Sequence, residues 1–187
     1  AREIEVIKEE RRLRTDDKPN AKAYERFKAI AYPASGYHTP TIGWMADLDR
    51  MTVQELRHWY ESWYVPNNAT LVVVGDVKPD EVKALAQRFF GPIPRRDVPP
   101  SKKPLELAEP GLRQITVHVA TQMPSLMYGF NVPSLATATD PQSVNALRLI
   151  SALLDGGYSA RIPARLERGE ELVTGASSDY DAYTRGD

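Results

Sequence analysis

Two glutamates near the start of the sequence, Glu3 and Glu10, have a type and spacing suited to metal binding. They lie in residues 1–14, a stretch without Pro or Gly that is rich in straight-chain residues and therefore predicts a helix. Four apolar side chains fall on one broad face of that helix: Ile4, Val6, Ile7 and Leu13. Both glutamates fall in the middle of the same face, two turns apart. A carboxylate on the buried side of a helix is costly unless it is paired or bound to a metal.

A simpler interpretation needs no metal. Glu10 and Arg14 are spaced i,i+4, which commonly gives a helix-surface ion pair worth about 0.3–0.5 kcal/mol. Glu3 lies at the start of the helix, where a negative charge complements the helix dipole. The pattern alone leaves both interpretations open.

Composition limits the class of protein. The chain has 187 residues, 42% of them apolar and 26% charged, which is ordinary for a globular protein. The formal net charge of −1 offers no electrostatic basis for binding nucleic acid or an anionic membrane. Cysteine is absent, so disulfides and thiolate metal sites are excluded. No apolar run approaches the roughly 20 residues of a membrane span.

Hydrophobic patterning predicts a mixture of helices and strands. Strand-like runs occupy residues 69–74, 114–120, 126–132 and 172–183. Predicted helices include residues 21–31, 53–64, 79–91 and 140–154. The helix at 53–64 follows a Thr52-x-x-Glu55 capping box, and its aromatic face is expected to be core. The order of elements predicts an α+β fold of the mixed α/β sandwich type.

A proline-rich segment divides the sequence. Residues 92–111 contain six prolines among charged residues, which is typical of an extended, semi-rigid linker. We therefore predict two domains, at residues 1–91 and 112–187, joined by this linker. The chain begins inside a helical pattern and stops just after a strand-like run, so we expect it to be an internal part of a longer protein.

No set of residues in this sequence forms a complete active site. The histidines, His38, His58 and His118, lack the spacing of a zinc-binding pair on one helix face. The sequence has no nucleophile elbow, phosphate loop or dinucleotide-binding fingerprint. Among the histidines, His38 alone lies in a predicted loop, which makes it the one of functional interest.

Several segments, in order, resemble the insulinase/pitrilysin family of zinc peptidases. These are the stretch from Glu3 to Arg11, Pro40-Thr-Ile-Gly43, Trp63-Tyr-x-Pro-Asn-Asn68, Leu71 to Val77, and Leu153 to Arg161 followed by Leu166 to Leu172. The resemblance covers nearly the whole chain and depends on the ordered set. The family's hallmark H-x-x-E-H is absent from this sequence.

The resemblance implies a zinc metalloendopeptidase as the parent protein. It makes Glu10 the third zinc ligand and Glu3 a supporting acidic residue nearby. Residues 1–91 would be the C-terminal half of a catalytic-type domain, and residues 112–187 the opening half of a similarly folded, non-catalytic domain. Without H-x-x-E-H, this chain is expected to be catalytically incomplete and not to retain zinc by itself.

Two other functions stay open. The parent could be a family member that has lost catalysis and serves as a structural or partner subunit, or the chain could be an unrelated α/β binding module. The resemblance implies a peptide or unfolded polypeptide substrate, allows a homo-oligomer or a related family subunit as partner, and favours the bacterial periplasm. No residue indicates the compartment.

Overall fold

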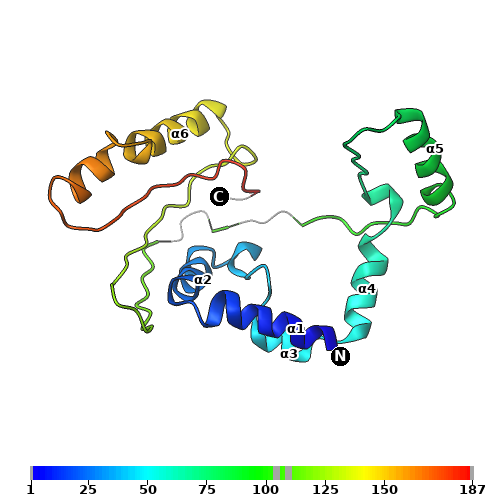
Figure 1. Ribbon diagram of the computed structural model, residues 1–187, viewed down its shortest axis with the longest axis horizontal. Helices are drawn as coiled ribbons and strands as arrows, with labels where there is room; N and C mark the ends of the chain where they lie inside the picture. The colour runs from blue at the N-terminus through cyan, green and yellow to red at the C-terminus, as the bar shows by residue number, and fades with distance from the viewer. Residues whose placement is uncertain (1, 103–105, 108–110, 186–187) are drawn as a thin grey trace. The chain divides into compact units, whose positions relative to one another are not determined.

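The computed structural model describes residues 2–102, 106–107 and 111–185, and the chain divides into two compact units. The first unit combines Ala1–Gly43 with Lys103–Asp187, and the second is Trp44–Lys102. Figure 1 shows the helices of both units joined by long irregular segments.

The first unit opens with two helices separated by a tight turn. Helix α1 spans Arg2–Arg11 and passes directly into a π-helical turn, η1, at Arg12–Asp16. Helix α2, Pro19–Ala31, begins at its proline, which suits the first turn of a helix because its missing N–H needs no partner there. The predicted helices were therefore present, although α2 begins two residues earlier than expected.

The later part of the first unit contains α6, Pro141–Asp155, and a second π-helical turn, η4, Pro163–Glu167. The Asp140 side chain accepts a hydrogen bond from the N–H of Gln142 at 3.0 Å and caps α6. Asn131 ties this part to the first helices, because its Nδ2 donates to the carbonyl oxygen of Ala31 at 3.3 Å. A short 3-10 turn, η2, Gly36–His38, lies between α2 and the end of the opening segment.

The second unit contains α3 (Met45–Arg50), α4 (Val53–Trp63), η3 (Pro66–Asn68) and α5 (Pro79–Phe90). The predicted capping box at the start of α4 is present. Thr52 N donates to Glu55 Oε2 at 2.8 Å, and Glu55 N donates to Thr52 Oγ1 at 3.2 Å.

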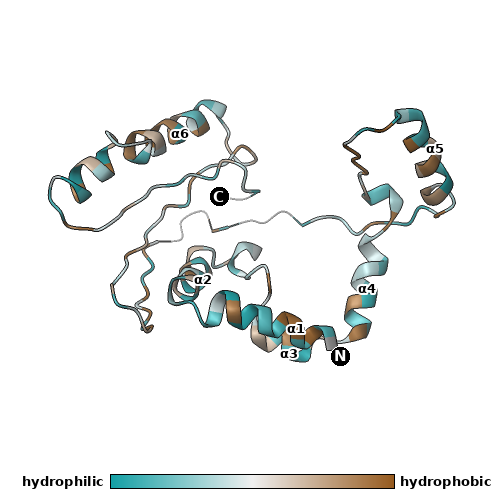
Figure 2. Cartoon of the chain, in the orientation of Figure 1, coloured by the Kyte–Doolittle hydropathy of each residue, from teal (hydrophilic) through white to brown (hydrophobic). Residues whose placement is uncertain are grey.

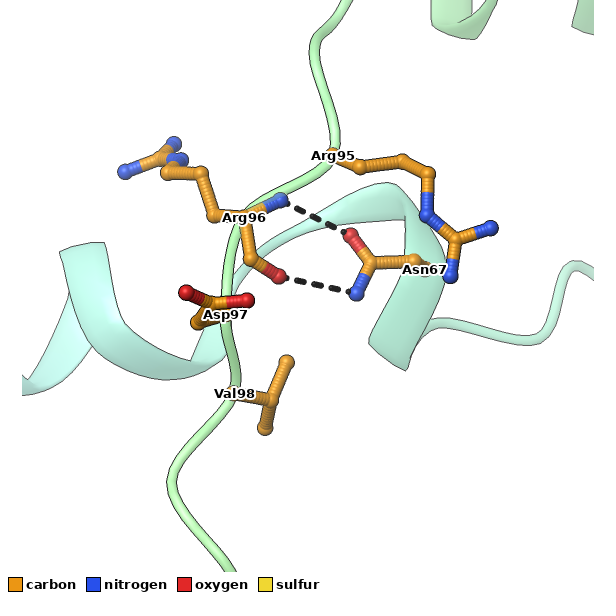
Figure 3. Close-up of a pocket in the computed structure, with 5 residues that line it drawn as sticks. All are labelled: Asn67, Arg95, Arg96, Asp97 and Val98. Carbon is orange, nitrogen blue, oxygen red and sulfur yellow. Dashed lines mark hydrogen bonds between the residues drawn. The ribbon is translucent and has the colours of Figure 1, made fainter.

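The Asn67 side chain holds the start of the proline-rich segment in the second unit. Its amide pairs with the backbone of Arg96 through two hydrogen bonds, Nδ2 to Arg96 O at 3.1 Å and Arg96 N to Oδ1 at 3.2 Å (Figure 3). The Arg96 guanidinium also donates to Glu61 O at 3.1 Å. The predicted linker, residues 92–111, thus begins anchored, while its residues 103–105 and 108–110 lie outside the described part of the chain.

The predicted α+β sandwich is wrong for the described residues, which form helices and no strand. The strand-like runs at 69–74, 114–120, 126–132 and 172–183 are irregular there. A β-strand forms only when a neighbouring strand completes its ladder of hydrogen bonds. The apolar or alternating sequence pattern of one segment does not indicate whether such a neighbour exists. Val72 and Val74, at 75% and 92% exposed, show that the first of these runs is uncovered.

The aromatic face of α4 is also not core, since Trp59 and Tyr60 are 55% and 57% exposed. Figure 2 shows further apolar residues along α5 and in the segment before it. The buried apolar residues in the described part are Leu48, Val65, Val144 and Ala182. No helix there is long and apolar enough to cross a membrane.

Candidate functional site

Glu10 lines a cavity of about 480 Å³ formed by α1, η1, α2, η2 and the loop that follows η2. Its side chain is 41% exposed and pairs with Arg14 at 3.0 Å. The cavity is also lined by Arg14, Thr15, Ala21, Tyr24, Glu25, Lys28 and residues 37–42. Glu10 therefore presents an accessible carboxylate to a space that could receive a ligand, and the ion pair expected from the i,i+4 spacing is present.

Glu3 lies in the first turn of α1, exposed, and is not among the residues that line the cavity. Seven residues of helix separate it from Glu10, about 10 Å along the axis. The apolar face is itself partly uncovered in the described structure, since Val6 of α1 and Leu13 of η1 are both 58% exposed while Ile4 is half-buried. The burial that made the two glutamates unusual in the sequence is therefore partial at Glu10 and absent at Glu3.

The residue after Glu10 forms a buried ion pair that sequence reasoning missed. The Arg11 guanidinium donates to both carboxylate oxygens of Glu25, at 2.8 and 3.0 Å, and to the carbonyl oxygen of Gly43 at 2.9 Å. Arg11 and Glu25 are 4% and 8% exposed. The hydrogen bond to Glu25 raises the pKa of Arg11 despite its burial.

A signal for this pair was present in the sequence. Arg11 follows Ile4 and Ile7 at i+7 and i+4, so it continues the apolar face of the helix. A charged residue in such a position requires a buried partner. The sequence could not show that the partner is Glu25, because that depends on how α1 and α2 pack.

His38 lies in η2 and lines the same cavity as Glu10. Its Nδ1 is 2.7 Å from the carbonyl oxygen of Ser35, which fixes the orientation of the ring. Glu106 holds the turn before it, accepting hydrogen bonds from Ala34 N at 3.1 Å and Ser35 N at 3.0 Å. His58 and His118, in contrast, are not among the cavity residues.

The described residues do not form a complete metal site. No group of three or more His, Cys, Asp or Glu side chains is arranged there to hold a metal ion. Catalytic zinc takes three protein ligands, and a half-exposed carboxylate such as Glu10 can supply one. Glu10 thus offers the cavity a donor of a type that zinc accepts, and the described residues do not complete a site around it.

Comparison with known proteins gives the class of protein, a peptidase family. Residues 50–187 match the family model described as the peptidase M16 inactive domain, and the chain belongs to that family. The resemblance to the insulinase/pitrilysin peptidases is thereby confirmed.

Individual relatives carry the name zinc protease. The chain is 31% identical over 179 residues to "Zinc protease PqqE" of Helicobacter pylori, covering 94% of this chain and 39% of the relative. It is 35% identical over 89 residues to "Probable zinc protease PqqL" of Escherichia coli, covering 48% of this chain and 10% of the relative.

A solved structure shares the fold. The crystal structure of a protease from Helicobacter pylori matches 96% of this chain and 43% of its own, with a TM-score of 0.68 and 27% identity. The chain thus spans less than half the length of each of these relatives.

Proposed function

We propose that this chain is part of a longer zinc-dependent metalloendopeptidase that hydrolyses peptides or unfolded polypeptides. Glu10 is the third protein ligand of the zinc ion, and Glu3 is a supporting acidic residue. The other ligands belong to an H-x-x-E-H segment that this chain lacks, so the chain alone is catalytically incomplete. When bound, zinc supplies a Lewis acid that activates water.

The observation that carries this proposal is the position of Glu10. In a chain that belongs to the M16 family, Glu10 contributes a partly exposed carboxylate to the lining of a cavity of about 480 Å³. Its partner in the described structure, Arg14, is itself 73% exposed. An exposed ion pair of this kind contributes little stabilising free energy, so the Glu10 carboxylate loses little when a metal ion replaces Arg14 as its partner.

The test is the Glu10→Gln variant of the longer protein that carries this chain. Removing a ligand carboxylate is expected to weaken zinc affinity by more than about 100-fold, since loss of even an outer partner commonly costs about 10–100-fold. Peptide hydrolysis is expected to fall with it. Zinc content and peptide cleavage measure both effects.

Glu9→Gln is the matched control. Glu9 is the neighbouring glutamate of α1 and pairs with Arg12 at 2.9 Å on the exposed side of the helix. This variant is expected to keep zinc and activity. If Glu10→Gln also keeps both, the role assigned to Glu10 is wrong.

A second candidate function is a non-catalytic structural or partner subunit. It is favoured by the description of the matching family model as an inactive domain, which covers residues 50–187 and does not include α1. The sequence that precedes Ala1 in the longer protein distinguishes the two candidates. An intact H-x-x-E-H several tens of residues upstream supports the peptidase, and a degenerate one supports the subunit.

The remaining parts of the proposal concern the surroundings of the enzyme. Its partners are a peptide substrate and a second copy or related family subunit, and its compartment is the bacterial periplasm. Fractionation of cells that express the longer protein tests the compartment. Size measurement of the native assembly tests the second copy or related subunit.

A further inference from the structure

The buried ion pair between Arg11 and Glu25 involves the residue that follows Glu10 in α1 and a second residue that lines the same cavity. Its geometry is bidentate, with two N–H groups of the guanidinium aimed at the two oxygens of one carboxylate. Such paired hydrogen bonds fix direction as well as distance, because both groups are planar. The pair is therefore suited to holding α1 and α2 in one relative orientation.

The same guanidinium reaches the third wall of the cavity. It donates to the carbonyl oxygen of Gly43, which ends the loop that contains Pro40, Thr41 and Ile42. Gly43 has a φ of +84°, a backbone conformation that favours glycine. One side chain thus joins α1, α2 and the loop, and each of the three contributes residues to the cavity.

The helix also changes character at this point. Helix α1 ends at Arg11, and the chain continues as the π-helical turn Arg12–Asp16, whose Asp16 lies 3.6 Å from the Arg11 guanidinium. A change from α to π geometry alters the direction in which neighbouring side chains project. Arg11 thus anchors the last residue of α1, one position after Glu10 and directly before the change.

We propose that Arg11 and Glu25 are positioning residues that hold the Glu10 carboxylate in the orientation needed to bind zinc. The inference rests on the proposed function of Glu10 and adds a requirement that the role of Glu10 alone does not contain. Neither residue is assigned to contact the metal.

A purely stabilising role makes a different prediction. Buried ion pairs contribute little net stability, and replacing both members by apolar residues of similar volume is often neutral or stabilising. If the pair serves stability alone, an apolar replacement that restores folding also restores zinc binding. If it positions Glu10, folding recovers and zinc affinity does not.

The first experiment measures zinc affinity of the longer protein by competition with a chromogenic chelator. Arg11→Lys keeps the charge but loses the planar fork, and Glu25→Gln keeps the shape but loses the charge. Both are expected to weaken zinc affinity by about 10–100-fold, the usual effect of removing a partner behind a ligand. Circular dichroism of the metal-free variants at the assay temperature verifies that they are folded.

Arg12→Lys is the matched control for Arg11→Lys. Arg12 is the adjacent arginine. It pairs with Glu9 at 2.9 Å, and both side chains are exposed. The same chemical change one residue away is expected to leave zinc affinity within about twofold of wild type, as for a surface ion pair of little energetic weight.

The double variant Arg11→Met, Glu25→Leu separates position from stability. It is expected to unfold at a temperature close to that of wild type and to bind zinc at least about tenfold more weakly. Wild-type zinc affinity in this variant, or in a folded Arg11→Lys variant, overturns the inference.

The outcome for wild type and Glu10→Gln identifies which claim has failed. If wild type binds zinc, Glu10→Gln does not, and the Arg11 and Glu25 variants bind like wild type, the positioning role alone is wrong. If Glu10→Gln binds zinc like wild type, the proposed role of Glu10 is wrong and the positioning role falls with it.

Discussion

The Glu10 carboxylate has two alternative partners, Arg14 and the proposed zinc ion. The ion pair with Arg14 spans 3.0 Å between side chains that are 41% and 73% exposed. A surface pair of this kind contributes about 0.3–0.5 kcal/mol, far less than metal ligation. The two interpretations of the sequence are therefore compatible, because the ion pair can hold Glu10 until a metal replaces it.

Glu106 gives a prediction about pH at the residue scale. Burial alone would raise the pKa of Glu106. Hydrogen bonds from the N–H groups of Leu107, Ser35 and Ala34, together with the charge of Arg113, outweigh burial, so the pKa of Glu106 is lowered. The hydrogen bonds to the turn before His38 are thus present at pH values above about 4.3, the ordinary value for Glu, and are lost as the pH falls through the lowered pKa.

The amide proton shifts of Ala34 and Ser35 measure this titration directly. They are expected to move together with a midpoint below about 4.3, and the movement is expected to vanish in Glu106→Gln. Glu81→Gln, which removes an exposed partner of Lys78, is expected to leave the titration unchanged. A midpoint at or above the ordinary value would contradict the assigned hydrogen bonds.

Some of the site could be predicted at the residue scale and some could not. The spacing of Glu10 and Arg14 along one helix predicted their contact, because helix geometry alone brings i and i+4 together. The contact between Arg11 and Glu25 joins two helices, so it depends on packing that one-dimensional periodicity does not contain. Glu106, 72 residues from Ala34, is more distant still.

At the scale of elements, local signals predicted helix ends well. The predicted capping box of Thr52 and Glu55 is present, and α5 and α6 begin with a first-turn proline and an Asp140 cap close to the predicted starts at residues 79 and 140. Each involves residues within one turn, so the sequence contains the whole interaction. Strands failed as predictions because their partners are distant in sequence, and the structure pairs none of them within the described residues.

Thr52→Ala tests the capping box as an element. Loss of an N-cap hydroxyl is expected to destabilise helix α4 by about 1 kcal/mol, since the N–H of Glu55 loses its acceptor. Amide exchange of the first turn of α4 measures the effect. Thr52→Ser keeps the hydroxyl and is expected to exchange like wild type, so equal exchange in Thr52→Ala would show that the cap contributes nothing.

At the scale of the whole molecule, the described chain exposes much of its apolar surface. Leu112, Val74 and Leu126 are 96%, 92% and 85% exposed, while few apolar side chains are buried. Exposed apolar side chains such as these are available to be covered by another chain or segment. The predicted domains, at 1–91 and 112–187, stay a prediction. The compact units of the structure divide the chain in another way, into Ala1–Gly43 with Lys103–Asp187 and Trp44–Lys102.

Expression of residues 1–187 alone tests the state of this surface. The isolated chain is expected to increase the fluorescence of the dye ANS, which binds exposed apolar surface, and the longer protein is expected to do so much less. Equal fluorescence from the two, at equal molar concentration, would show that the rest of the longer protein does not cover this surface.

The central claim is that Glu10 binds zinc, and a crystal structure of the zinc-loaded longer protein tests it most directly. Anomalous scattering at the zinc edge locates the ion without reference to its ligands. We predict a Glu10 carboxylate oxygen about 2.0–2.2 Å from zinc, the usual zinc–carboxylate distance, with Arg14 displaced from it. A zinc ion with a complete set of other ligands, and Glu10 still paired with Arg14, would contradict the claim.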